Sequence, residues 1–233
     1  MENILYKYMV ERFKEDKIDK KHTPNLPFIT ISREYGCPAK EIAALLVENL
    51  NKQIAKDNVI PPWRWISKEI LEVASEELNV NPSRIKLLFG NEKRGIIEEI
   101  LTSLSQRYYH SDQKIRKTLA QVITDFAFDG NVVIVGRGGI AATLEVVNGL
   151  HIRLIAPIEW RANKIKERGY CDSIEQAKQI AYDTDKKRAE FINSMNKKTI
   201  DNTSFDLTYN CQFLNKDEIV SSIIYHLKMK GMI

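Results

Sequence analysis

The sequence predicts an α/β fold in which a parallel sheet is covered by helices on both faces. Three short apolar runs, at 28–31, 131–136 and 151–156, are typical of strands buried in a parallel sheet. Segments with helical periodicity separate these runs. Because strands that alternate with helices return to the same sheet through helical crossovers, we expect three layers, helix on sheet on helix.

The remaining elements follow from local patterns. Residues 1–16 carry an amphipathic helical stripe, and a charge-dense linker follows, so the N-terminal unit is expected at 1–23 and the main domain at 24–233. Further helices are expected at about 39–55, almost throughout 67–128, after Pro157, and at 217–228. Weaker strands are expected at 63–66 and 205–210.

Composition narrows the class of function. The chain has 233 residues, 43% of them hydrophobic, and a net charge of +4, which suits an anionic small molecule but not a dedicated nucleic-acid binder. No apolar run approaches membrane-spanning length, and the first residues lack a signal-peptide core, so we expect a cytoplasmic protein without a membrane partner. The three cysteines have wide spacing that fits no metal site, and we expect reduced thiols.

The segment 28–46 has the strand–loop–helix layout of a phosphate-binding loop. Aligned with the Walker A pattern, it places Pro38 at the second glycine, Ala39 at the lysine and Glu41 at the magnesium-binding hydroxyl. Proline offers no N–H donor, although Arg33 and Lys40 could still reach a phosphate. The predicted loop residues are Arg33, Gly36, Cys37, Pro38, Ala39, Lys40 and Glu41. The alternative is a buried strand that simply precedes a helix, with Cys37 filling a tight turn.

A second candidate site follows the strand at 131–136, where the chain reads Gly136-Arg137-Gly138-Gly139. Ligands of open α/β sheets bind beyond the carboxyl ends of the strands. A guanidinium among glycines is well suited to hold a phosphate there in a bidentate manner. The alternative is a tight turn with Arg137 in solvent.

A third candidate site lies on two basic helices after Pro157. Arg161, Lys164 and Arg168 form one stripe of the first helix, which Gly169 ends. In the second helix, which begins at a capping box over 173–176, Arg188 falls in the apolar sector with Asp185 at its margin. The two residues either form an exposed pair three residues apart or face a nucleotide cleft, where arginines stabilise a transferring phosphoryl group.

These three sites, in this order, resemble the cytidylate kinase-like family of P-loop nucleoside monophosphate kinases. The matching pieces are Ile29–Gly36 with Glu41-Ile-Ala, Val133–Gly138, Ala156–Arg161, Asp185–Arg188 and Phe205-Asp-Leu. The resemblance implies a phosphate loop at 33–41, a helical lobe for the nucleoside monophosphate at 67–128 and a lid at 157–190. It also implies ATP with Mg²⁺ as donor and CMP or dCMP as acceptor.

By the same resemblance, the acceptor would be bound by Arg137, Gly138 and Ser67. The catalytic residues would be Lys40, Arg161, Arg168 and Arg188, with Asp185 and Lys187 supporting the lid; no side chain is assigned to a metal. The chain departs from the family pattern: Cys37, Pro38 and Ala39 stand where the family has Ser-Gly-Gly, and Ser67 and Gly138 stand where it has aspartates.

Three functions therefore stay open. The first is a nucleotide kinase. The second is a degenerate relative that binds a nucleotide or phosphorylated metabolite without transfer, which the altered loop favours. The third is single-strand nucleic-acid binding through Trp63-Arg-Trp65, for which the alternative is that both tryptophans pack the strand against helices.

Overall fold

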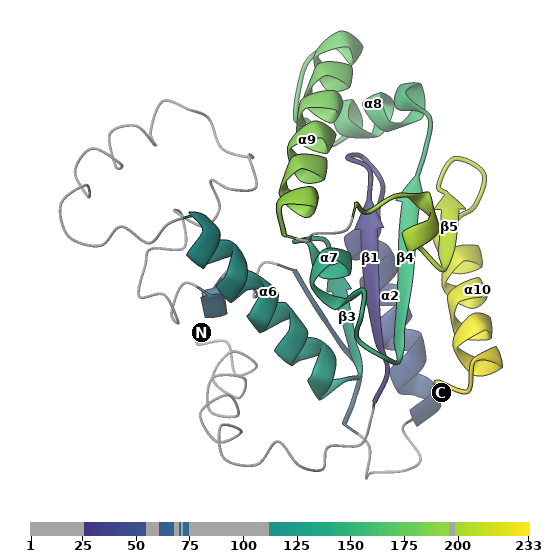
Figure 1. Ribbon diagram of the computed structural model, residues 1–233. Coiled ribbons are helices and arrows are strands. Elements are labelled where there is room, and N and C mark those ends of the chain that lie inside the picture. Colours follow the sequence, from purple (N-terminus) through teal and green to yellow (C-terminus); the bar gives the residue numbers. More distant parts are fainter. Residues whose placement is uncertain (1–25, 55–60, 68–69, 71, 75–111, 196–198) are drawn as a thin grey trace, which may run out of the picture.

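The computed structural model describes residues 26–54, 61–67, 70, 72–74, 112–195 and 199–233 (Figure 1). Within these residues a five-stranded sheet has the order β2–β3–β1–β4–β5, and every pair is parallel. The predicted α/β class with helices on both faces is confirmed. The expected N-terminal unit at 1–23 and most of the helical lobe at 67–128 lie outside the described residues.

Strand β1 (Phe28–Arg33) occupies the centre of the sheet between β3 (Val132–Val135) and β4 (Gly149–Ile155). The edge strands are β2 (Arg64–Ile66) and β5 (Leu207–Asn210). The apolar runs form strands because both faces of β1 and β3 are buried, as expected for a parallel sheet. Parallel pairing brings the carboxyl ends of all the strands to one edge.

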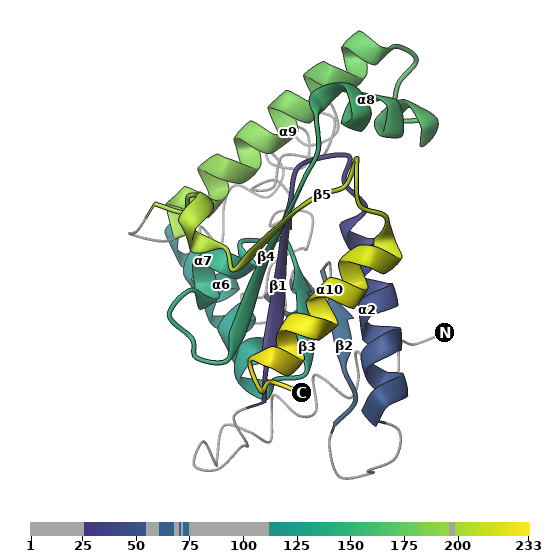
Figure 2. The same cartoon turned by 90° about the vertical axis from the view of Figure 1, so that its right-hand side faces the viewer.

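Helices α2 (Ala39–Ile54) and α10 (Lys216–Met229) cover one face of the sheet, as Figure 2 shows. Their apolar stripes meet alternate residues of the central strands, including Ile29, Ile31 and Ile152, in one buried core. Asn215 is the N-cap of helix α10 and forms a complete capping box, in which the side chains of Asn215 and Glu218 each accept a hydrogen bond from the other's backbone N–H.

Helices α6 (Asp112–Asp129) and α7 (Gly139–Thr143) lie on the opposite face. The second core joins α6 to the alternate strand residues, with Phe28, Phe126 and Ile134 fully buried. Helix α6 confirms the helical stripe expected before the second strand. Helix α7 was not predicted, because its five residues are too few to show a helical period.

Helices α8 (Ile158–Glu167) and α9 (Ile174–Met195) lie above the carboxyl ends of the strands (Figures 1 and 2). They pack against each other through Ala162, Ile165, Ala177 and Ala181. A 3₁₀ turn, η1 (Asn202–Ser204), then leads into β5. No helix in the described part of the chain is long and apolar enough to cross a membrane.

Candidate functional site

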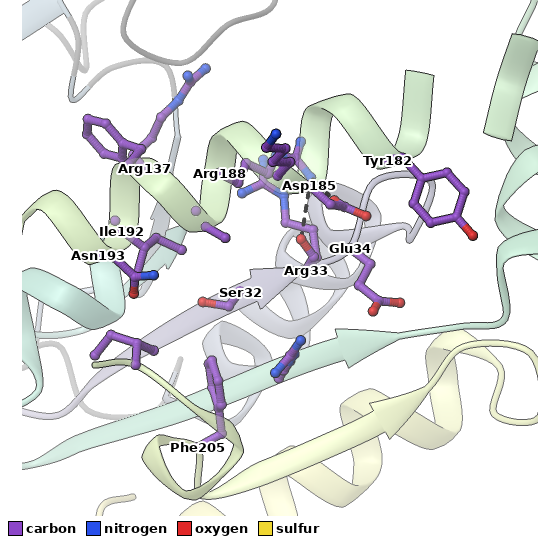
Figure 3. Close-up of a pocket in the computed structure, with 17 residues that line it drawn as sticks. Ser32, Arg33, Glu34, Arg137, Tyr182, Asp185, Arg188, Ile192, Asn193 and Phe205 are labelled. Atoms are coloured by element: carbon purple, nitrogen blue, oxygen red, sulfur yellow. Dashed lines mark hydrogen bonds and ion pairs between the residues drawn. The ribbon is translucent and has the colours of Figure 1, made fainter. Parts of the chain in front are cut away.

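A cavity of about 480 Å³ lies between α9 and the carboxyl ends of β1 and β3 (Figure 3). This volume falls within the range of roughly 300–1,000 Å³ typical of small-ligand sites. The cations that line it are Arg33, Arg137, Arg153, Lys186 and Arg188. The acids that line it are Glu34 and Asp185, and both are already within ion-pair distance of a buried arginine, Arg161. The cavity therefore favours an anion.

Three arginines form the centre of this positive charge: Arg33 at the end of β1, Arg137 after β3, and Arg188 on α9. Burial, together with the charges of Arg188 and Arg137, lowers the pKa of Arg33 to about 9. Burial also lowers the pKa of Arg188. Arg33 thus lies close enough to Arg188 and to Arg137 for the like charges to repel, and a phosphate beside it would relieve this repulsion.

The glycine-rich turn after β3 fits around Arg33. Gly136 has a φ of +70°, and a Cβ atom there would overlap the Arg33 guanidinium. Arg137 has a φ of +56°, and Gly138 follows with +77°. A non-glycine residue held in the left-handed region is strained, and such strain clusters at ligand sites. The Arg137 side chain points away from Ser32, at the α9 end of the cavity (Figure 3).

Asp185 holds this region together. Its carboxylate accepts a hydrogen bond of 2.8 Å from the backbone N–H of Tyr35 and one of 2.7 Å from Nη1 of Arg161. Arg188 lies 3.6 Å from the same carboxylate, over the ring of Tyr35, and donates to the backbone oxygen of Arg33. Asp185 and Arg188 form the expected pair three residues apart, half-buried rather than exposed, and both also line the cavity.

Several backbone donors of the predicted phosphate loop are bound within the protein. The N–H of Tyr35 binds Asp185, that of Cys37 binds Glu34, and that of Ala39 binds the carbonyl of Cys37. Pro38 has no N–H to offer. The Arg161 side chain also crowds the turn, since a Cβ at Gly36 would lie 2.9 Å from the Cβ of Arg161. Of the predicted loop residues, Arg33 lines the cavity and the others do not.

The two buried cysteines meet beside this loop. The Cys37 thiol is hydrogen-bonded to the Cys211 thiol at the end of β5, and this bond and burial raise the pKa of Cys37. Both residues belong to the core under α2. Cys37 therefore fills space in the turn, as the structural alternative predicted, and its thiol is poorly suited to act as a nucleophile.

Several predicted catalytic residues lie outside the cavity. Lys40 and Glu41 are exposed on the first turn of α2, where Glu41 pairs with Arg168 at 3.4 Å. Arg161 is buried, and its donors bind Asp185 and the backbone oxygens of Ala156 and Tyr35. Ser67 is buried after β2, and Lys187 is exposed on α9. The residues that do meet at the cavity are Arg33, Arg137, Gly138, Asp185 and Arg188.

The structure adds cavity residues to which the sequence analysis gave no site role. Among them are Ser32, Glu34, Arg153, Tyr182, Asn193 and Phe205. One signal was available, because Arg153 interrupts a mostly apolar strand, and Ser32 lies beside it in the β1–β4 register. Among the described residues, no group of three or more His, Cys, Asp or Glu side chains is placed to hold a metal ion.

The sequence and the fold of this chain are similar to those of known proteins. The model of the cytidylate kinase-like family matches residues 28–212. The crystal structure of an uncharacterized protein from Eubacterium ventriosum ATCC 27560 has a TM-score of 0.61 and 19% identity, covering 87% of this chain and 98% of that chain. No curated protein matches the sequence.

Two kinase structures are more distant. A gluconokinase from Sinorhizobium meliloti 1021 has a TM-score of 0.44 and 9% identity, covering 89% of this chain and 99% of its own. The thymidylate kinase of Candida albicans has a TM-score of 0.46 and 13% identity, covering 89% and 93%. The family match includes all five strands and both helices above the cavity, and so the chain belongs to the cytidylate kinase-like family.

Proposed function

We propose that the protein transfers a phosphoryl group from ATP to a nucleoside monophosphate, with CMP or dCMP as the acceptor. The observation that supports this most directly is the cluster of Arg33, Arg137 and Arg188 in a cavity at the carboxyl ends of parallel strands. Phosphoryl transfer needs little covalent chemistry from the protein. It depends mainly on positioning and on stabilising negative charge, which buried guanidinium groups provide.

In this proposal Arg33 and Arg188 hold the acceptor phosphate, and Arg137 approaches it from the turn after β3. Asp185 positions Arg188 and also ties the buried Arg161 to the loop after β1. Arg161 of α8 and Arg168 at its C-terminal end support the site through their contacts with Asp185 and Glu41. That they contact the transferred group directly is expected only from the family resemblance.

Because cationic residues outnumber acidic ones in its lining, the cavity suits nucleotide phosphates better than a bare metal cation. Its two acids lie 3.4 Å and 2.7 Å from Arg161, so neither is a vacant ligand for Mg²⁺. Mg²⁺ keeps several waters and is commonly held through substrate phosphates plus one or two carboxylates. Glu34 or Asp185 would have to give up its contact with Arg161 to serve as that carboxylate. When bound, it would neutralise charge on the donor phosphates.

A second function is favoured by the state of the loop. Because the N–H groups of residues 35, 37 and 39 are bound internally and Pro38 has none, the donor phosphates would meet fewer backbone donors than in an intact phosphate loop. A protein that binds a nucleotide or phosphorylated metabolite without transferring phosphate would need only the arginine cluster. The nucleic-acid hypothesis gains no support, because Trp63 is buried and Trp65 packs against the same core.

The test is phosphorus NMR of the purified protein with ATP, Mg²⁺ and a set of nucleoside monophosphates. We expect ADP and one new nucleoside diphosphate to appear together. The Arg188→Leu variant, prepared in the same way, should show no transfer, which excludes a contaminating kinase. Binding of a monophosphate with no ADP formed would overturn the kinase proposal in favour of the binding protein.

A further inference from the structure

Two of the three cysteines meet at the edge of the sheet where the strands end, outside the cavity. Cys37 lies in the turn between β1 and α2, and Cys211 is the residue after β5. Both are free cysteines, and their thiols are hydrogen-bonded to each other. Phosphate binding by the arginine cluster leaves this pair without a role.

Backbone hydrogen bonds to the end of β4 bring the two thiols together. The N–H of Cys211 donates to the carbonyl of Ile155 at 2.8 Å, and the N–H of Glu34 donates to the neighbouring carbonyl of Leu154 at 3.0 Å. The N–H of Cys37 then donates to the carbonyl of Glu34 at 3.2 Å. Both cysteines belong to the same buried core under α2. The sheet and the turn thus hold the two sulfur atoms beside each other in the reduced protein.

The hydrogen bond makes the two thiols unequal. It raises the pKa of Cys37, and burial raises that pKa further. The same bond lowers the pKa of Cys211, against the effect of burial. Cys37 therefore keeps its proton and donates it to the sulfur of Cys211. Because the thiolate is the reactive form of a cysteine, Cys211 is the better nucleophile of the two.

The pair lies at the rim of the core rather than at its centre. Cys37 and Cys211 are each 7% exposed, whereas Ile31 and Ile42 of the same core are 0% exposed. Cys211 also begins the surface turn that carries Phe213, which is 76% exposed. Solvent is therefore close to both sulfur atoms, and a small oxidant has a short way to reach them.

We propose that Cys37 and Cys211 form a reversible oxidation site, at which hydrogen peroxide converts the two thiols to a disulfide. The Cys211 sulfur attacks one peroxide oxygen and the O–O bond breaks. Cys211 becomes a sulfenic acid, and the departing hydroxide takes the Cys211 proton to form water. The Cys37 sulfur then attacks the sulfenic sulfur, so that an S–S bond forms and the sulfenic oxygen leaves with the Cys37 proton as a second water. A dithiol reverses the oxidation by thiol–disulfide exchange.

The disulfide would join the turn between β1 and α2 covalently to the end of β5. Tyr35 in that turn donates its backbone N–H to Asp185, which lines the cavity, at 2.8 Å. Oxidation would therefore constrain one border of the cavity. The oxidation site does not depend on the proposed function, because its chemistry involves only the two sulfur atoms and the oxidant.

The test is mass spectrometry of the folded wild type after treatment with hydrogen peroxide, with the remaining thiols then alkylated in denaturing urea. We expect Cys171 alone to be alkylated, and a peptide linking Cys37 to Cys211 that disappears after treatment with dithiothreitol. Cys171→Ala is the matched control. Cys171 is half-buried and its thiol donates to the carbonyl of Ser173, so its removal should leave the yield of the linked peptide unchanged.

Two further variants separate the roles of the sulfur atoms. In Cys37→Ala the oxidised Cys211 has no partner thiol, and dimedone should trap its sulfenic acid. In Cys211→Ala, Cys37 should stay a thiol at the same peroxide dose. A wild type in which Cys37 and Cys211 are still alkylated, or are linked only to Cys171 or to other chains, would overturn the oxidation site. Equal dimedone labelling of the two variants would overturn the assignment of Cys211 as the attacking sulfur.

Discussion

Among single residues, Gly136 decides where the Arg33 guanidinium lies, because a Cβ atom would occupy the same space. Gly136→Ala should therefore displace Arg33 and weaken CMP binding by about tenfold or more, the typical worth of one charge-assisted hydrogen bond. Gly169→Ala is the control. Gly169 has almost the same φ, +73° against +70°, but nothing lies within 4 Å of a Cβ there.

Both variants place alanine in the left-handed region and should lose about 1–2 kcal/mol of unfolding free energy. Urea denaturation measures that shared loss, and calorimetry measures the binding. Equal CMP affinities for the two variants would show that the position of Arg33 is irrelevant to the ligand.

The depressed pKa of Arg33 predicts a dependence of stability on pH. Below about pH 9 Arg33 is charged in both states, and burial makes that charge unfavourable in the folded protein. Above about pH 9, and up to the much higher pKa of a free guanidinium, the unfolded chain binds more protons, so the contribution of Arg33 to unfolding free energy rises with pH. Arg33→Met should therefore be more stable than wild type at pH 8, and the difference should shrink toward pH 10.5.

Urea denaturation of both proteins across this pH range measures the difference directly. Lysines and arginines distant from Arg33 titrate alike in the two proteins and cancel in the comparison. If the wild type is the more stable of the two at pH 8, Arg33 stabilises the fold, and its charge is not unfavourable in the absence of an anion.

Sequence reasoning found the charged residues of the cluster because each departs from its surroundings. Arg137 stands among glycines at a strand end, and Arg188 lies in an apolar helical sector. The family resemblance assigned Arg161 and Lys40 to catalysis, although their side chains lie outside the cavity. Helical periodicity shows on which face of its helix a residue lies, but not on which side of the helix the ligand binds. It also does not show that Asp185 of α9 binds Arg161 of α8 and so occupies that arginine.

At the scale of elements, Asp185 joins α9 to α8 and to the loop after β1. Asp185→Asn should lower the unfolding free energy by about 1–3 kcal/mol. This is less than the 3–5 kcal/mol for breaking a fully buried pair, because the Asp185 side chain is 26% exposed. Asp183→Asn serves as the control, since Asp183 is exposed on the same helix and accepts a hydrogen bond from Gln179.

Chemical denaturation of the two variants beside the wild type checks this prediction. If Asp183→Asn and Asp185→Asn lose the same stability, the effect belongs to helix α9 in general and not to the contacts of Asp185.

Elements with a clear period were predicted closely. Helix α10 was expected at 217–228 and is found at Lys216–Met229, and α2 was expected from Ala39 and begins there. Strand β5 begins two residues later than expected, at Leu207, because η1 and its capping box take up the preceding residues. Short elements whose ends are fixed by side-chain caps are set by tertiary contacts, so periodicity alone does not locate them.

At the scale of the whole molecule, parallel topology is what creates the cavity. Ser32, Arg137 and Arg153 come from separate segments of the chain, and they meet because β3, β1 and β4 are neighbours with their carboxyl ends together. The sequence predicts this edge as the binding edge, since every parallel α/β sheet uses it. The strand order and the path of α9 across that edge depend on packing, which the sequence pattern does not show. This order and this path bring Phe205 into the lining of the cavity.

The central claim is that the arginine cluster binds the phosphate of a nucleotide, and the ionisation of that phosphate tests it most directly. Phosphorus NMR of CMP with saturating protein, recorded over a pH range, follows the second pKa of the phosphate, which is about 6 for a free phosphomonoester. Guanidinium groups stabilise the dianion, so the account predicts a pKa well below that value in the complex. Bound CMP whose phosphate still titrates near 6 would contradict it.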